Sequence, residues 1–410
     1  MTTRYRTALI KWATVPSLAW LQIPIGQNGT IDRTDDLVGQ PLCLPVSVAI
    51  DRRLARGSGQ SDHVTPHRLV RSAVARRDAE LDWRRGLEPV LVSAGFFVIG
   101  GYIMARTMSS RTWSCRDAGR FVARRYCRLV LPFLAAMVLA IGARAAGRGW
   151  LPERVVDHPA TWDQVLAHIV LLQDILGYQS LSAGFWFVAI DFQLGLIYVA
   201  LLCLRDFAAW LSGGGAGERA NGLLLAAGCV LAAPAMFVFN LDPRWDVWAI
   251  YFFGQFFLGV MVYEGLKSTA SAIGFGLYVA LTAAALAFAW RWQLATALAI
   301  AVVLFSAGKL ALTQRWPRSR LIARLGLTSY SLFLVHFPVL VLVSTIWSRL
   351  GCATVTSAVV ASVAAYVASL AAAEVFYRLV ESPTLALATR IGRSRPAPVS
   401  LATRESGSAV

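Results

Sequence analysis

Charged residues are scarce in this chain, and their scarcity excludes an ordinary water-soluble domain. Only 15% of the 410 residues are Asp, Glu, Lys or Arg, whereas 57% are hydrophobic, which is too apolar for ordinary globular packing. Apolar stretches recur with short gaps from about Glu88 to Val380. Each is long enough to cross a hydrocarbon core of roughly 30 Å at about 1.5 Å per residue. We therefore expect an integral membrane protein.

Several chemical signatures are missing as well. The six cysteines are scattered, with neither a CxxC pair nor the spacing of metal ligands, so no metal site is expected. The sequence contains no Gly-rich phosphate loop and no nucleophile elbow. No clean secretory signal is visible, because Pro16 and Pro24 interrupt the apolar stretch near the N-terminus.

The apolar stretches predict an all-α fold, a polytopic bundle of about nine transmembrane helices, since a helix satisfies its own backbone polar groups in lipid. The predicted spans are residues 88–106, 128–146, 184–204, 221–241, 245–265, 271–290, 293–313, 325–347 and 353–374. Residues 163–178 are apolar but short, so we expect a partial or surface helix there. Three regions follow: a polar, basic and poorly ordered N-terminal region at 1–87, a membrane domain at 88–385, and a tail at 386–410.

Acidic residues are too few to balance the arginines, and the net charge is +16. The arginines cluster between predicted spans, where they set membrane orientation; no DNA-binding motif accompanies them, so nucleic acid is not an expected partner. Nine spans place three basic regions on one side, the cytoplasm: the loop between the first two spans, the turn at 314–324, and the tail. With nine spans, the arginines of residues 1–87 would lie on the side opposite the cytoplasm, which does not fit the pattern of the other basic regions. One additional span before Glu88 would place them in the cytoplasm.

Arg116, Arg120, Arg124 and Arg128 stand four residues apart, with Arg125 beside them. On a helix they form one stripe, in which like charges repel by about a few tenths of a kcal/mol per pair. A polyanionic partner would reverse that cost, and guanidinium groups suit phosphate oxygens. The alternative is a purely topological role with contact to anionic membrane lipids, and spacing alone favours this alternative.

Two residues within predicted spans, Asp191 and His336, could carry chemistry. Asp191 is costly at that depth, so it should face the bundle interior, a cavity or a partner; Tyr198 falls seven residues on, on the same face. His336 lies two residues before Pro338, which cannot donate to the Leu334 carbonyl, so the helix should bend there. The imidazole can carry protons or join helices by a hydrogen bond, and both interpretations remain open.

Three further residues have a plainer expected role. Glu381 lies at the cytoplasmic end of the last span and is expected to pair with arginines there rather than act on a substrate. His158 and His168 lie in or beside the outward-facing stretch between the second and third spans. We expect both histidines at the surface.

Several short segments, taken in order, resemble the membrane-bound acyltransferase family 3. Each is weakly specific alone, but the ordered set is quite specific. The segments are Gly95–Tyr102, Phe121–Arg128 with Pro132, Leu171–Asp174, Trp186–Tyr198, Leu325–Gly326 with Ser329–His336, and Tyr377–Pro383.

The resemblance implies about ten membrane helices and the transfer of an acyl group, with acetyl as the expected one, from cytoplasmic acyl-CoA to a hydroxyl of a cell-envelope carbohydrate. The family is similar to the O-acetyltransferases of bacterial surface polysaccharides. The implied partners are acyl-CoA as co-substrate, a carbohydrate or lipid-linked glycan acceptor, and membrane lipids, with no metal. The implied location is the bacterial inner (plasma) membrane, with the arginine loop and the C-terminus in the cytoplasm.

The same resemblance implies roles for individual residues. The catalytic candidates are Asp191 and His336, and the candidates for binding the phosphates of coenzyme A are Arg120, Arg124, Arg125 and Arg128. One feature departs from the family, whose first helix carries a basic residue followed at a fixed spacing by a histidine. Here Arg52 with His63, and Arg56 with His67, have that spacing only in a polar stretch that cannot span. The first span is therefore expected to be lacking, and activity to be impaired.

A transporter or flippase of a lipid-linked glycan is the alternative function. Asp191 and His336 would then serve as substrate or proton sites inside the bundle. Inverted repeats or paired broken helices would favour this alternative, and the sequence shows neither.

Overall fold

The fold is a bundle of helices, seen here in a computed structural model. Seven of the helices are long and apolar enough to cross a membrane by length and composition, and no strand occurs among the described residues, so the predicted all-α bundle is confirmed. The N-terminal region at 1–87 lies outside the described residues. These are residues 93–151, 153–156, 158–213, 218–310, 319–351 and 354–391.

Each of the nine predicted spans overlaps one long helix. Two 3₁₀ turns (Phe239–Leu241 and Pro243–Trp245) join the helix Glu218–Phe237 to the helix Ala249–Gly265. A π-helical turn (Tyr377–Glu381) joins the helix Val355–Phe376 to the helix Ser382–Ile391. In chain order the helices are one at residues 93–108, α3 (Cys115–Gly147), α4 (Glu153–Val156), α5 (Trp162–Ile169), α6 (Phe185–Leu211), α7 (Glu218–Phe237), α8 (Ala249–Gly265), α9 (Thr269–Phe288), α10 (Trp292–Lys309), α12 (Arg320–Arg349), α13 (Val355–Phe376) and α14 (Ser382–Ile391).

The largest boundary error concerns the arginine loop. Helix α3 begins at Cys115 rather than at residue 128, with Ser114 as its N-cap, and only residues 109–114 form the turn before it. A span predicted from hydropathy ends where charged residues begin. The helix itself continues, because arginine is a good helix former and its long side chain reaches the membrane surface. The arginine stripe therefore lies on the first turns of α3.

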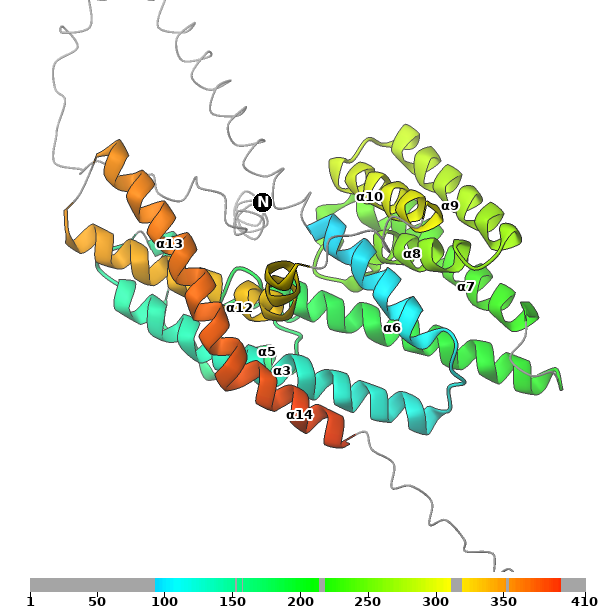
Figure 1. Ribbon diagram of the computed structural model, residues 1–410, viewed down its shortest axis with the longest axis horizontal. Coiled ribbons are helices and arrows are strands. Elements are labelled where there is room, and N and C mark those ends of the chain that lie inside the picture. Colours follow the sequence, from blue (N-terminus) through cyan, green and yellow to red (C-terminus); the bar gives the residue numbers. More distant parts are fainter. Residues whose placement is uncertain are drawn as a thin grey trace, which may run out of the picture.

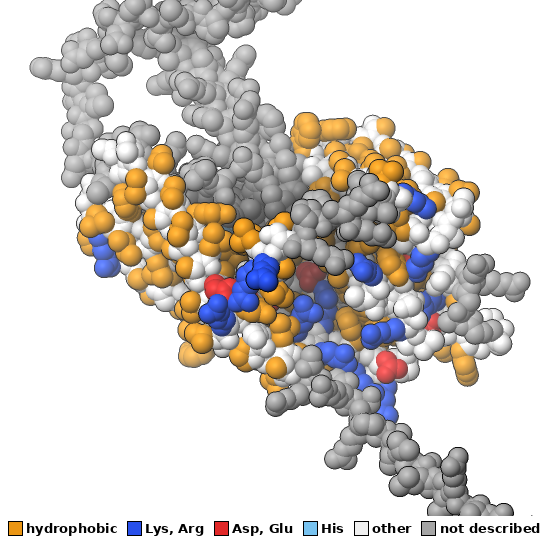
Figure 2. All heavy atoms as spheres, in the orientation of Figure 1, with side chains coloured by type: hydrophobic (Ala, Val, Ile, Leu, Met, Phe, Trp, Pro, Cys, Tyr) orange, Lys and Arg blue, Asp and Glu red, His pale blue; other side chains and the backbone are white. Residues whose placement is uncertain are grey.

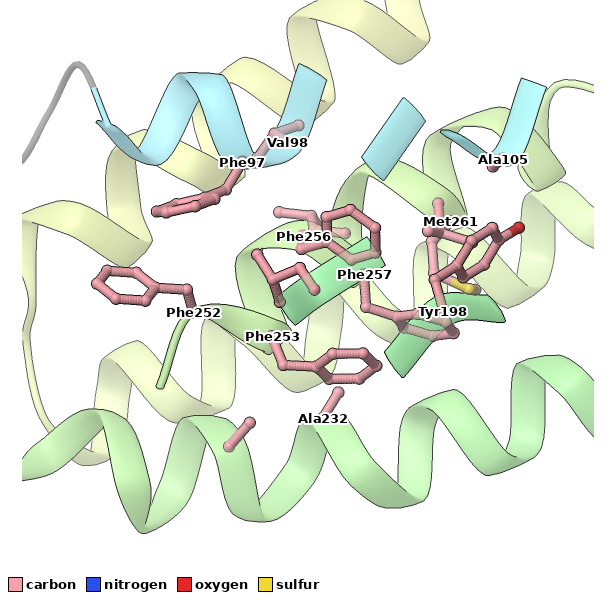
Figure 3. Packing of buried hydrophobic residues seen from close by; sticks show 14 of the residues in the cluster. Phe97, Val98, Ala105, Tyr198, Ala232, Phe252, Phe253, Phe256, Phe257 and Met261 are labelled. Atoms are coloured by element: carbon pink, nitrogen blue, oxygen red, sulfur yellow. The ribbon is translucent and has the colours of Figure 1, made fainter. Parts of the chain in front are cut away.

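The helices form two groups, with α6 and the 93–108 helix between them (Figure 1). One group contains α7, α8, α9 and α10, and the other contains α3, α5, α12 and α13. Each group has its own hydrophobic core. The first core holds Phe97, Tyr198 and the phenylalanines of α8 (Figure 3), and the second holds Phe133, Phe185 and Leu334. Because α6 contributes to both cores, it joins the two groups.

The 93–108 helix crosses α8 at very close range. A Cβ atom built on Gly101 would lie 1.9 Å from the carbonyl oxygen of Phe256, and one built on Gly259 would lie 1.9 Å from the carbonyl oxygen of Val98. No side chain fits between the two backbones. Small residues allow such an approach between membrane helices, where dispersion contacts replace the hydrophobic effect as the source of association.

The segment between α4 and α6, residues 158–184, is termed the α5 segment. Its short helix α5 is followed by turns up to Gly177, so a partial helix is confirmed. His158 is exposed as predicted, but the prediction of a surface position for His168 is wrong, because its side chain is fully buried. It lies near Phe133 and Phe185, since the apolar stretch folds back into the bundle.

His168 is held as a neutral ring. Its Nδ1 lies 2.7 Å from the carbonyl oxygen of Gln164, and the backbone N–H of Leu181 donates to its Nε2 over 3.0 Å. A carbonyl only accepts hydrogen bonds, so the ring proton must be on Nδ1. Protonation of Nε2 would break the bond from Leu181.

Acidification is therefore expected to loosen the α5 segment. Burial is the main cause that lowers the pKa of His168 and Arg144 adds to it, whereas the Gln164 bond and Asp174 oppose it. A folded-state pKa below the unfolded value of about 6.5 means that this stabilisation is complete above that pH and is lost as the pH falls below it. Thermal unfolding in detergent should show a steeper fall in Tm below about pH 6.5 for the wild type than for His168→Gln. His158→Gln is the control and should behave as wild type; parallel wild-type and His168→Gln curves would contradict the assignment.

Candidate active site

The arginine stripe marks one end of the bundle. Arg116 and Arg128 are exposed, whereas Arg120, Arg124 and Arg125 are half-buried. Figure 2 shows Lys and Arg side chains gathered over the middle and lower part of one face, between hydrophobic surfaces on either side. The stripe thus offers guanidinium groups at the surface and continues into the bundle. We term the end at which α3 begins the arginine end.

Asp191 and Arg125 form an ion pair inside the bundle. Arg125 Nη2 lies 2.7 Å from the Asp191 carboxylate and 3.2 Å from the Asp191 carbonyl oxygen. Gly195 makes room for the arginine, because a Cβ there would lie 2.8 Å from Arg125 Nε. The side chains are only 18% and 24% exposed. The prediction that Asp191 faces the interior or a partner is confirmed.

Residues from α12 and the π-helical turn lie near this pair. The Tyr330 hydroxyl donates to the carbonyl oxygen of Leu129 over 2.8 Å, and the carboxylates of Asp191 and Glu381 are close enough for their charges to act on it. We term Arg125, Arg128, Asp191, Tyr330 and Glu381 the polar layer. Three helices (α3, α6 and α12) and the π-helical turn build it, and π-helical turns such as the one ending at Glu381 are frequent at functional sites.

Glu381 does not pair as predicted. Its carboxylate is buried and accepts a 2.5 Å hydrogen bond from the Ser331 hydroxyl, while Arg128 contributes a nearby positive charge. The ion pairs of this region belong instead to Glu374, which binds Arg324 and Arg378. The π-helical turn is the reason, because it rotates Glu381 toward α12.

His336 lies at a different depth from Asp191. Along α12, Tyr330 is near Asp191, whereas Phe333 contacts Phe187 and stands against Gly184 at the start of α6. His336 is six residues beyond Tyr330, which is about 9 Å along a helix axis. The two catalytic candidates therefore lie at separate levels of the bundle.

The His336 imidazole has a defined orientation. Its Nδ1 lies 3.1 Å from the Leu332 carbonyl oxygen, and α12 runs without interruption past Pro338. Because a carbonyl only accepts, Nδ1 carries the hydrogen of the neutral ring and Nε2 carries the lone pair. A ring in this tautomer can take up a proton at Nε2.

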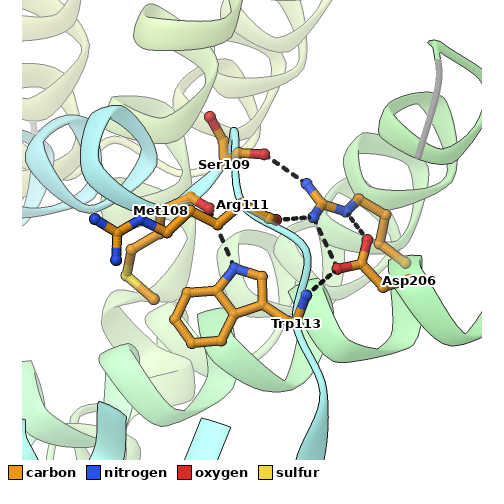
Figure 4. A network of polar contacts seen from close by, with 6 residues as sticks. Met108, Ser109, Arg111, Trp113 and Asp206 are labelled. Carbon is orange, nitrogen blue, oxygen red and sulfur yellow. Dashed lines mark hydrogen bonds and ion pairs between the residues drawn. The ribbon is translucent and has the colours of Figure 1, made fainter. Parts of the chain in front are cut away.

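A second buried ion pair, Arg205 with Asp206, holds the turn before α3 (Figure 4). Arg205 is 3% exposed and donates to the carbonyl oxygens of Ser109 and Arg111 over 2.7 and 2.6 Å. Asp206 accepts from the backbone N–H of Trp113 over 2.5 Å. Sequence analysis missed both residues, because their partners are backbone groups about ninety positions away. The pair positions the start of α3 and hence the arginine stripe.

Comparison with known families decides the identity. The family described as "Acyltransferase domain" matches residues 92–378, a range that contains the arginine stripe, Asp191 and His336. This chain belongs to membrane-bound acyltransferase family 3. Comparisons with curated proteins and with solved structures found no match.

In this family 3 member the structure brings some predicted site residues together and keeps others apart. Arg125 pairs with Asp191, and Arg128 is exposed but lends its charge to Glu381. Arg120 is 3.9 Å from Asp117 on the same helix instead. Arg124 is half-buried beside them. Among the described residues, no group of three His, Cys, Asp or Glu side chains is arranged to hold a metal ion.

Proposed function

We propose that this multi-pass acyltransferase transfers an acyl group, acetyl in the simplest case, from cytoplasmic acyl-CoA to a hydroxyl of a cell-envelope carbohydrate. The observation that carries the proposal is the Arg125–Asp191 pair, which extends an exposed arginine stripe into the bundle interior. The excess of arginines at the arginine end supports an orientation in which that end faces the cytoplasm, and the proposal assigns the protein to the inner membrane. The acyl donor then approaches from the arginine end.

The start of α3 fits the phosphates of coenzyme A. Arg116, Arg120, Arg124 and Arg128 follow one side of the helix, and guanidinium groups bind phosphate oxygens through paired hydrogen bonds. The positive end of the helix dipole adds to their field. Bound phosphates would also offset the repulsion between neighbouring arginines of the stripe.

The interior groups fit the chemistry of acyl transfer. The acceptor hydroxyl attacks the thioester carbonyl carbon, its proton passes to a base, and the carbon–sulfur bond breaks as the thiolate of coenzyme A leaves and takes up a proton. An alcohol needs such a base. Nε2 of His336, on α12, is the nitrogen that can accept the proton. Arg125 Nε is buried without a hydrogen-bond partner among the described residues. It can donate to the oxyanion that develops on the carbonyl oxygen.

Loss of one stripe arginine is expected to weaken coenzyme binding. Arg124→Ala should reduce the affinity for coenzyme A at least about tenfold, because one charge-assisted hydrogen bond contributes about 1.5–3 kcal/mol. Calorimetric titration of protein in nanodiscs measures the affinity. Arg148→Ala is the matched control, since Arg148 is exposed and lies at the other end of α3.

The proposal is wrong if purified protein releases no coenzyme A from acetyl-CoA with any carbohydrate acceptor and Arg124→Ala binds coenzyme A as tightly as the wild type. Movement of a lipid-linked glycan across vesicle membranes without acyl-CoA would instead support a transporter. The two assays use the same purified protein, so their outcomes can be compared directly.

A further inference from the structure

The α5 segment reaches the interior of the bundle. The Tyr126 hydroxyl on α3 donates to the carbonyl oxygen of Ile169 over 2.7 Å, and Leu171 is buried in the second core with Phe133 and Leu334. Leu171 adopts a left-handed backbone conformation with φ of +57°, which costs a non-glycine residue about 1 kcal/mol or more. Packing maintains this turn, and the two residues that follow Leu172 are consequently buried.

The amide of Gln173 has one orientation and an unsatisfied oxygen. Its Nε2 lies 3.3 Å from Asp174 Oδ2 and 3.4 Å from the Phe185 carbonyl oxygen. Both neighbours accept hydrogen bonds, so the NH₂ group must face them and Oε1 must point away. The side chain is fully buried, and Oε1 has no hydrogen-bond partner among the described residues. A buried acceptor without a donor costs about 1–3 kcal/mol, so a ligand group or water that donates to Oε1 would stabilise this site.

Asp174 adds a carboxylate to the amide. It is buried, and its oxygens accept from Gln173 Nε2 and from the Ser180 hydroxyl, the latter over 3.4 Å. The two side chains thus present acceptor oxygens rather than donors at this place. A hydroxyl group can donate to such oxygens without bringing a charge. The aromatic rings of Phe133 and Phe185, with centroids 4.2 Å apart, pack near the same segment and make its surroundings apolar.

We infer that Gln173 and Asp174 form the subsite that binds a hydroxyl of the carbohydrate acceptor. The identity of the ligand as an acceptor rests on the proposed function. The position of the subsite agrees with the proposed function. Gln173 donates to the Phe185 carbonyl oxygen at the start of α6, and Phe333, one turn before His336, contacts that same end of α6. The acceptor hydroxyl therefore lies on the His336 side of the polar layer, and the donor arrives from the arginine end.

Carbohydrate binding without acyl-CoA tests the inference. Glucose, N-acetylglucosamine and rhamnose serve as probes, and saturation-transfer NMR measures their binding to the full chain in nanodiscs. At least one probe should bind the wild type, and Gln173→Met and Asp174→Asn should each weaken that binding about tenfold, the effect of one hydrogen bond to a buried polar group. Asp174→Asn keeps the size of the side chain, so it decides the question if Gln173→Met fails to fold. Arg148→Ala should bind as the wild type does.

Each outcome separates this inference from the proposed function. Binding of no probe, or wild-type affinity in both variants, overturns the subsite and leaves bound water as the partner of Gln173. Probe binding that depends on Gln173, without acetyl-CoA turnover, supports the subsite and contradicts the acyltransferase mechanism. Turnover whose KM for the carbohydrate is unchanged in both variants supports the mechanism and overturns the subsite.

Discussion

Asp191→Ala is expected to reduce acyl transfer at least about a hundredfold. The change removes the carboxylate that orients the Arg125 guanidinium, the proposed donor to the oxyanion, and loss of one such donor raises a reaction barrier by about 2.7–4 kcal/mol. The lower end of that range corresponds to roughly a hundredfold in rate. The measurement is kcat/KM for carbohydrate-dependent release of coenzyme A from acetyl-CoA.

Two further variants show whether that loss of activity comes from the Arg125–Asp191 pair. If Arg125 and Asp191 act as a unit, the double variant Arg125→Met/Asp191→Ala should be no slower than the worse of the two single variants. Glu374→Ala is the matched control, because Glu374 also pairs with arginines, but with Arg324 and Arg378, whose side chains are largely exposed. It should retain near-wild-type activity. Equal losses in Asp191→Ala and Glu374→Ala would show that the position of Asp191 carries no special role.

Gly101→Ala is expected to destabilise the bundle by about 3 kcal/mol or more, the upper range for overpacking. The added methyl group would lie 1.9 Å from the Phe256 carbonyl oxygen, and a backbone atom cannot rotate away as a side chain can. The 93–108 helix must therefore separate from α8. Tm in detergent should fall by about 5–15 °C, measured by intrinsic fluorescence, and Gly259→Ala should have a similar effect for the same reason.

Gly142→Ala and Gly276→Ala are the matched controls. A Cβ at either position meets no atom within 4 Å, and alanine favours a helix over glycine by about 1 kcal/mol. Both variants should be as stable as the wild type or slightly more so. A Gly101→Ala protein that unfolds together with these controls would mean that the two helices do not cross closely.

The membrane helices could be predicted from hydropathy because the bilayer acts on each stretch separately. A span must be about 20 residues long and apolar whatever its neighbours are, so each predicted span overlaps a helix. The start of α3 was misjudged because charge ends an apolar stretch without ending a helix. His168 was misjudged for a related reason: a short apolar segment can be buried by folding back between helices, which no local pattern distinguishes from a surface helix.

The candidate site was predicted residue by residue but not as an arrangement. Asp191 was recognisable because a carboxylate in a span is costly, and the arginine stripe was recognisable from its four-residue spacing. Their pairing joins positions 66 residues apart, a relation that no spacing rule contains. The burial of Glu381 and the separate depth of His336 depend equally on how α12 lies against α6 and α13.

The sequence alone determined that this chain crosses a membrane as helices, with a stripe of arginines at one end and with Asp191 and His336 within its spans. Composition and periodicity decide these properties, because they act through the solvent and through the geometry of a single helix. Only the tertiary structure decided that Arg125 neutralises Asp191, that Gly101 lies against the backbone of α8, and that Gln173 is buried with an oxygen that no described residue satisfies. Each of these depends on which turns of neighbouring helices come into contact, and that is set by packing between segments distant in the chain.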